Sequence, residues 1–126
     1  MPVAVTHHGA RYATETPDGQ WLFICDGRHL VRMHPDGSGE TLVRDGVYTN
    51  LWTMGGSGVY VIDDNSNDLL RAPFGGTVFE KVLHFDDARA PAGGGNCLAL
   101  PRDESYLIYR SVVRSVNTLM LLDGLR

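Results

Sequence analysis

With 126 residues, 43% of them hydrophobic, the chain is long enough for one domain with a buried core. The formal net charge is −4, and the 11 lysine and arginine residues are spread along the chain. Because a nucleic-acid site needs a basic patch that neutralises phosphates, we expect no nucleic-acid partner. No stretch approaches the roughly 20 apolar residues of a membrane-spanning helix, so we also expect no membrane partner.

The N-terminal segment is expected to be a strand rather than a secretion signal. Met1–His8 lacks both the basic and the long apolar segment of a signal peptide. This predicts a cytoplasmic protein, or a periplasmic or secreted one if a longer precursor is trimmed. Within the segment, Pro2–Thr6 is a short valine-containing run of the kind that favours a β-strand.

Residues 10–44 are predicted to form a sheet of four strands. The first strand precedes a Pro-Asp-Gly turn, and the others are short runs rich in aliphatic and aromatic residues, bounded by Gly, Asp and Pro. Asp18-Gly19 and Asp36-Gly37 supply residues that tolerate a positive φ in tight turns. The predicted strands are Ala10–Glu15, Trp21–Cys25, His29–His34 and Glu40–Arg44.

The same order of strands and turns recurs twice, over residues 47–84 and 95–126. The second copy has four predicted strands: Thr49–Met54, Val59–Ile62, Asp68–Ala72 and Phe79–His84. The third copy has three: Asn96–Leu100, Tyr106–Tyr109 and Thr118–Leu122. The outer strand that the third copy lacks is supplied, in this interpretation, by Pro2–Thr6.

The spacing of the copies predicts a β-propeller. Aligning Trp21, Tyr60 and Tyr106 gives spacings of 39 and 46 residues, and propeller blades repeat at roughly 40–50. The predicted fold class is all-β, with three four-stranded blades in a single unit over residues 1–126. Propellers have about 4–8 blades, and an open array exposes sheet edges that pair with other chains. We therefore expect a homodimer that closes a six-bladed ring, in which Val3–Thr6 completes the last blade of the partner.

Residues 16–42, TPDGQWLFICDGRHLVRMHPDGSGETL, resemble the TolB-type, WD40-like propeller repeat. The third copy keeps Asp103, Tyr106 and Asp123-Gly124, whereas the second has Gly56-Ser57-Gly58 in place of Pro-Asp-Gly. The resemblance implies a propeller fold. It implies no single activity, because the repeat is similar to those of periplasmic scaffolds, of the propellers beside prolyl-peptidase domains, and of some lyases and lactonases.

The repeat register predicts a binding site at the mouth of the channel. Polar residues recur near the start of each inner strand, and further polar and aromatic residues lie in the neighbouring loops. Converging polar groups around a concavity make a default binding site, although such groups can also be merely solvated. The predicted ligand-binding residues are His8, Arg11, Tyr48, Asn50, Asn96 and Arg110.

The sequence predicts no metal and no cofactor. The five histidines, His7, His8, His29, His34 and His84, are scattered in the expected layout, whereas a metal site needs three or four converging ligands. The loop 63–68 lacks the glycine and the distal glutamate of a calcium-binding EF-hand loop. Cys25 and Cys97 have no metal-type spacing and are expected to be small buried side chains.

Three functions remain open. The favoured one is a non-catalytic scaffold or binding module that presents the channel mouth to a peptide, a protein or a small carbohydrate. The second is a propeller enzyme, of the lyase or lactonase kind, that acts on a sugar acid or lactone with His8, Arg11 and Arg110 as its candidate residues. The third is a propeller fragment, or an engineered half-propeller, whose main property is self-assembly. Enzymatic activity is therefore uncertain, with the non-catalytic interpretation preferred.

Overall fold

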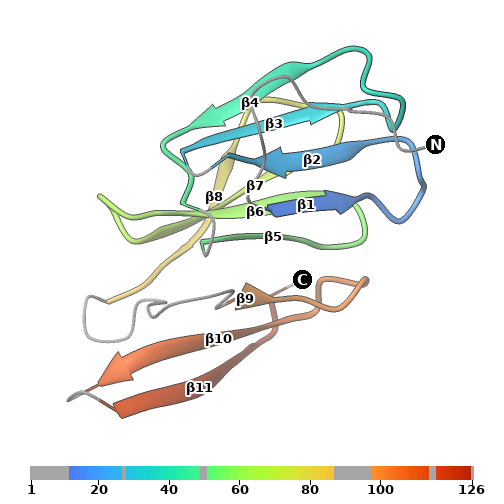
Figure 1. The fold of residues 1–126 in the computed structure, drawn as a ribbon. Helices are drawn as coiled ribbons and strands as arrows, with labels where there is room; N and C mark the ends of the chain where they lie inside the picture. The colour runs from blue at the N-terminus through green and yellow to red at the C-terminus, as the bar shows by residue number, and fades with distance from the viewer. Residues whose placement is uncertain (1–11, 27, 49–50, 87–97, 114–115, 126) are drawn as a thin grey trace. The chain divides into compact units, whose positions relative to one another are not determined.

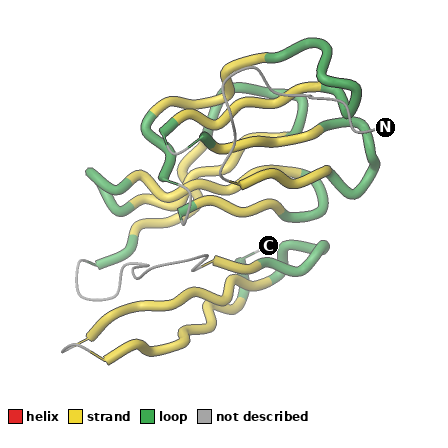
Figure 2. The backbone as a smooth tube through the Cα atoms, in the orientation of Figure 1, coloured by secondary structure: helices red, strands yellow, loops and turns green. Residues whose placement is uncertain are grey.

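The computed structural model is all-β, and Figure 1 shows its eleven strands arranged in three antiparallel sheets. Figure 2 shows that the described residues contain strands and loops but no helix. The structure describes residues 12–26, 28–48, 51–86, 98–113 and 116–125. Each of the eleven strands predicted within the three copies overlaps an observed strand, which confirms the all-β class. The chain divides into two units, Met1–Thr49 and Asn50–Arg126.

The first unit contains a four-stranded sheet in simple up-and-down order. Its strands are β1 (Tyr12–Glu15), β2 (Leu22–Cys25), β3 (His29–Met33) and β4 (Thr41–Asp45). Phe23, Cys25 and Leu30 are completely buried in its core. Burial of a Phe or Leu side chain contributes about 1.5–3 kcal/mol, so Phe23 and Leu30 stabilise the sheet.

The turn between β1 and β2 is closed by the Thr-Pro-Asp-Gly sequence. The hydroxyl of Thr16 donates to Asp18 at 2.6 Å and accepts from the backbone N–H of Trp21 at 3.1 Å. The N–H of Gly19 donates to the carbonyl of Thr16 at 2.9 Å, and Gly19 has a φ of 72°. This left-handed conformation is the reason that the turn has glycine at this position.

The second unit begins with another four-stranded sheet in the same order. Its strands are β5 (Trp52–Met54), β6 (Gly58–Asp63), β7 (Asp68–Pro73) and β8 (Glu80–His84). Val59, Tyr60 and Val61 are completely buried, although their side chains alternate between the two faces of the sheet. The second sheet is therefore covered on both faces along β6.

The outer hairpins of the first two sheets are copies of each other. The β3–β4 ladder shifts register between Leu30 and Val31, and the β7–β8 ladder shifts between Leu69 and Leu70, 39 residues further along the chain. A β-bulge at the same point of both hairpins bends both outer strands in the same way. This match is independent evidence for an internal repeat, because it concerns backbone pairing rather than residue type.

The third sheet has three described strands, β9 (Leu98–Ala99), β10 (Tyr106–Val113) and β11 (Val116–Asp123), in the order β11-β10-β9. Within the second unit β9 lies near β5, as Figure 1 shows. β11 is the outermost strand of this sheet in the described part of the chain. The strand predicted to complete it, Pro2–Thr6, lies outside the described residues.

Cross-strand pairing changes the alignment of the second copy. Phe23 pairs with Thr14 and Arg32, and Tyr60 pairs with Thr53 and Arg71. The two sheets thus carry matching Thr–aromatic–Arg rows, in which the counterpart of Tyr60 is Phe23, not Trp21 as the sequence alignment predicts. The cause is the Gly-rich turn between β5 and β6, which is shorter than the turn before β2 and moves the aromatic residue along its strand.

Candidate functional site

Only two of the six predicted binding residues lie in the described part of the chain. Tyr48 belongs to the first unit and Arg110 to the second. The other four, His8, Arg11, Asn50 and Asn96, lie outside the described residues. The predicted channel-mouth set therefore stays a prediction.

Tyr48 lies beside a polar hollow in the first unit. Its ring is half-buried and carries the guanidinium of Arg28 at 5.0 Å from the ring centre, in a cation–π contact. A hollow of about 480 Å³ is lined by Arg28, His29, Asp45 and Gly46. Nδ1 of His29 contacts the carboxylate of Asp45 across the β3–β4 ladder.

Asp26 fixes the strand that carries these side chains. Its carboxylate accepts from the backbone N–H of His29 at 2.9 Å and of Arg28 at 3.3 Å. Slight burial acts to raise the pKa of Asp26, but these two hydrogen bonds outweigh it and hold the pKa below the usual value. The start of β3, and with it the imidazole of His29, is thereby held in position.

The pairing of His29 with Asp45 recurs in the second sheet with the two residues exchanged. There Asp68 begins β7 and His84 ends β8, and His84 Nδ1 lies 2.8 Å from the carboxylate of Asp68. The hydrogen bond with His84 is the main cause that lowers the pKa of Asp68. Because a pair of this kind fastens the outer strand in both sheets, we assign it a structural role.

Arg110 lies on β10, opposite Leu119 of β11. The side chain is half-buried, and its Nε is buried without a hydrogen-bond partner among the described residues. A guanidinium in such a position is a candidate for a ligand or a partner that supplies an acceptor, since an unpaired buried donor is costly.

The most strongly organised polar cluster surrounds Glu104, which the sequence prediction did not single out. Its carboxylate accepts from the Tyr60 hydroxyl at 2.5 Å and from Arg71 Nε at 3.1 Å. It also accepts from the backbone N–H and the hydroxyl of Ser57, each at 2.8 Å. Arg71 Nη2 in turn donates to Ser57 Oγ at 2.7 Å. These bonds join the turn before β10 to the second sheet.

Two glycines make room for the Glu104 cluster. A Cβ on Gly55 would lie 2.3 Å from Cγ of Glu104, and one on Gly56 would lie 2.2 Å from the backbone carbonyl oxygen of Arg102. That same carbonyl accepts from the N–H of Gly56 at 3.0 Å. The Gly-Gly-Ser sequence of the β5–β6 turn is thus explained by close contact with the turn before β10.

The electrostatics of the cluster favour a permanently ionised carboxylate. Only 2% of Glu104 is exposed, and burial alone would raise its pKa. The hydrogen bonds from Tyr60, Ser57 and Arg71 outweigh this effect and lower the pKa to about 2. A carboxylate with all these donors in place is a poor general acid or base near neutral pH, so the cluster is a structural lock between the sheets.

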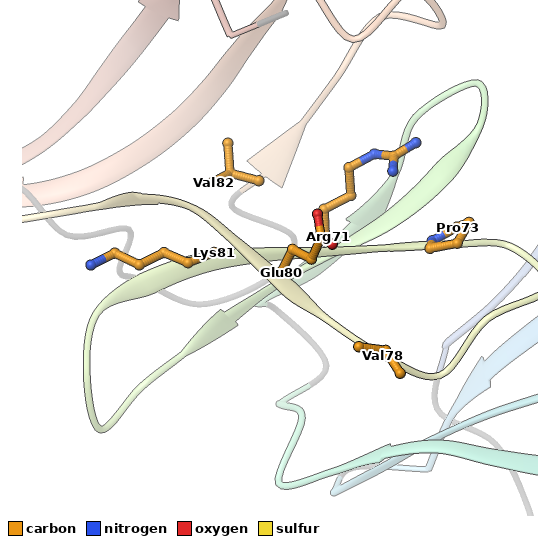
Figure 3. A pocket seen from close by; sticks show the side chains of 6 residues that line it. All are labelled: Arg71, Pro73, Val78, Glu80, Lys81 and Val82. Carbon is orange, nitrogen blue, oxygen red and sulfur yellow. The ribbon is translucent and has the colours of Figure 1, made fainter.

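A groove lies next to the Glu104 cluster, on the side of β7 and β8. Its volume is about 410 Å³, and Figure 3 shows that its side chains come from these two strands and the segment between them. The chain of Lys81 extends away from the guanidinium of Arg71, so the two cations do not converge on one point in the groove (Figure 3). The lining residues are Arg71, Pro73, Val78, Glu80, Lys81 and Val82.

The described residues hold no cluster of three His, Cys, Asp or Glu side chains that could bind a metal ion. His34 stacks on Trp21 with ring centres 4.8 Å apart. In the loop 63–68, Asp63 accepts from the N–H of Asn65 at 2.9 Å, and the N–H of Asn67 donates to the carbonyl of Asp63 at 2.7 Å. This loop is a tight hairpin turn closed by its own backbone. The thiol of Cys25 is buried and donates to the carbonyl of Val47 at 3.4 Å.

Comparison with known proteins gives a likeness in fold. No family model matches the chain, and no curated protein matches it. A solved structure from Bacteroides uniformis, described as a "putative 6-phosphogluconolactonase", matches with a TM-score of 0.51 and 20% sequence identity. The match covers 88% of this chain and 36% of that one, so the chain spans little more than a third of that protein's length. In the described residues no helix is long and apolar enough to cross a membrane.

Proposed function

We propose that the chain is a non-catalytic β-propeller module with three blades, two copies of which close one ring. The ring would present the mouth of its channel to a peptide, a protein or a small carbohydrate. The observation that carries the proposal is the repeated outer hairpin, in which the same bulge recurs after 39 residues. The resemblance of residues 16–42 to the TolB-type repeat supports it from the sequence.

The edge of the third sheet supports assembly. Strands β3 and β7 each pair with a further outer strand, whereas their counterpart β11 is an edge strand in the described part of the chain. An edge of eight residues is a template for another strand. In the proposed ring, Val3–Thr6 of the partner copy fills this place.

Removing residues 2–6 tests the strand exchange. We expect the truncated chain to lose the dimer and to aggregate through the uncovered edge of β11. A dimer of unchanged stability after this truncation would contradict the exchange. A synthetic peptide with the sequence of residues 1–8 should restore solubility to the truncated chain, and a scrambled peptide should not.

Ligand binding is tested by thermal shift with panels of peptides and oligosaccharides. A ligand selective for the folded state raises the melting temperature by mass action. We expect Asn96→Ala, at another of the predicted binding residues, to abolish the shift produced by a channel ligand while the dimer persists. If no member of either panel produces a saturable shift, the binding part of the proposal fails and assembly alone remains.

The second candidate is a lactonase-like enzyme, favoured by the likeness to the structure described as a 6-phosphogluconolactonase. The hollow with Arg28, His29 and Asp45 would supply a cation for an anionic substrate and an imidazole held by a carboxylate, a pairing suited to a general base. The exchanged copy of this pair in the second sheet favours the structural role instead. Release of acid from gluconolactone and its 6-phosphate, measured with the intact chain and with His29→Asn, decides between the two. Turnover that His29→Asn abolishes would establish the enzyme.

A further inference from the structure

We propose that the exposed face of the third sheet is the docking surface for the first sheet of a second copy of this chain. The inference rests on the ring proposed above, and it deepens that proposal by locating the junction between the copies. The open face, as we call it, consists of Ala99, Ile108, Arg110, Leu119 and Leu121. Leu119 and Leu121 are 74% and 62% exposed, and Ala99 is also exposed.

Cross-strand rows align the third sheet with the second. In the second sheet Trp52 and Val61 are paired and buried, and in the third sheet Leu98 and Tyr109 are paired and buried in the same way. The adjacent row is Thr53–Tyr60–Arg71 in the second sheet and Ala99–Ile108–Leu121 in the third. The open face of the third sheet is thus the counterpart of the face of the second sheet that carries Tyr60.

In the second sheet, the equivalent face is covered by another part of the chain. Tyr60 is completely buried, and it and Arg71 bind the carboxylate of Glu104, which lies in the turn before β10. The third sheet therefore covers the Tyr60 face of the second sheet with the turn that precedes its own central strand. If this packing is repeated once more, the equivalent turn of another sheet lies on the open face of the third sheet.

The turn before β2 has the required shape. Gly19 donates its N–H to the carbonyl of Thr16 at 2.9 Å, and Glu104 donates to the carbonyl of Pro101 at 3.0 Å. Gly19 and Glu104 both have a left-handed backbone, with φ of 72° and 58°. They occupy equivalent places in equivalent turns, but one has no side chain and the other has a carboxylate.

The chemistry of each turn matches a different face. The carboxylate of Glu104 is matched by the donors of Tyr60 and Arg71. The residues at the same places on the open face, Ile108 and Leu121, have no side-chain donor, so a carboxylate buried against these two would be costly. Gly19 brings no charge and so suits the apolar Ala99–Ile108–Leu121 row of the open face. The first sheet also has an exposed leucine, Leu42, which is 53% exposed. Leu42 pairs with Val31, and Val31 pairs with Ile24. This row of the first sheet corresponds to the row of Tyr109 in the third sheet. The occupant that fits is therefore the first sheet of a second copy.

Charge substitutions test the junction in the full-length chain. We expect Leu121→Arg to weaken the dimer at least tenfold in sedimentation equilibrium, with an unchanged circular dichroism spectrum. Val78→Arg is the matched control, because Val78 is 76% exposed and lies outside the open face, and it should leave the dimer unchanged. Leu119→Arg serves as a second variant on the open face if Leu121→Arg fails to fold.

Mixing two variants tests the identity of the occupant. Gly19→Glu supplies a carboxylate like that of Glu104, and Leu121→Arg supplies a guanidinium like that of Arg71. We expect a one-to-one mixture of the two single variants to form heterodimers, because one junction gains an ion pair and the other is unaltered. A wild-type monomer would overturn the ring itself. A wild-type dimer that Leu121→Arg leaves intact, or a mixture without heterodimers, would overturn this junction while leaving the ring proposal standing.

Discussion

The hydroxyl of Tyr60 lies 2.5 Å from Oε1 of Glu104, and this hydrogen bond joins the second sheet to the third. The two residues are 44 positions apart in the chain, so the contact fixes the packing of two repeats rather than a local turn. Glu104 takes a left-handed backbone conformation, with a φ of 58°, which is unfavourable for a residue with a side chain. The cluster of donors around the carboxylate offsets that strain.

Removal of the charge of Glu104 should loosen this junction. We expect Glu104→Gln to lower the free energy of unfolding by roughly 3 kcal/mol, because the partly buried guanidinium of Arg71 then loses its counter-ion. Urea unfolding measures the loss. Glu80→Gln is the matched control, since Glu80 is exposed, and it should change the stability by less than about 0.5 kcal/mol. Equal effects of the two substitutions would contradict the lock.

The Glu104 cluster should also make the free energy of unfolding depend on pH. The folded pKa of Glu104 is about 2, below the ordinary value of 4.5, so the unfolded chain binds this proton more readily. The contribution is complete above about pH 4.5 and is lost as the pH falls toward 2. We expect the difference in unfolding free energy between wild type and Glu104→Gln to shrink by roughly 2–3 kcal/mol over that range. A difference that does not vary with pH would show that the carboxylate is not held as described.

Gly56 should not tolerate a side chain. We expect Gly56→Ala to destabilise the chain by about 1–3 kcal/mol, because its Cβ would lie 2.2 Å from the carbonyl oxygen of Arg102. Gly75→Ala is the control. Gly75 has open space around its Cβ position and no positive φ, so that substitution should be neutral or slightly stabilising. Thermal unfolding followed by circular dichroism compares the two, and equal melting temperatures would refute the close contact.

Because the His–Asp pair occurs in opposite order in the two sheets, we expect His29 and Asp45 to be interchangeable. His29→Asp alone places a second carboxylate beside Asp45, and we expect the melting temperature to fall by on the order of a few °C. The double variant His29→Asp with Asp45→His recreates the order found in the second sheet, where Asp68 precedes His84. It should regain the wild-type melting temperature. A double variant no more stable than the single one would mean that the pair does not fasten β4.

The strands were predictable because their signals are local. Short apolar runs bounded by Asp-Gly and Pro turns place β2 and β3 within a residue or two. The role of Glu104 was not predictable, because a glutamate in a turn next to Asp103 looks like a solvated residue until the second sheet is in position. The His29–Asp45 contact was hidden for a similar reason, since it depends on the β3–β4 register. One signal was visible in the sequence: Glu104 stands where the first repeat has Gly19, and a side chain at that position calls for a compensating contact.

The molar mass of the full-length chain tests the central claim most directly. Sedimentation equilibrium at micromolar concentration should give a species of twice the chain mass of 13.8 kDa, because the proposed ring of six blades is closed by two copies of the chain. A single stable species of 13.8 kDa at the same concentration would contradict the account.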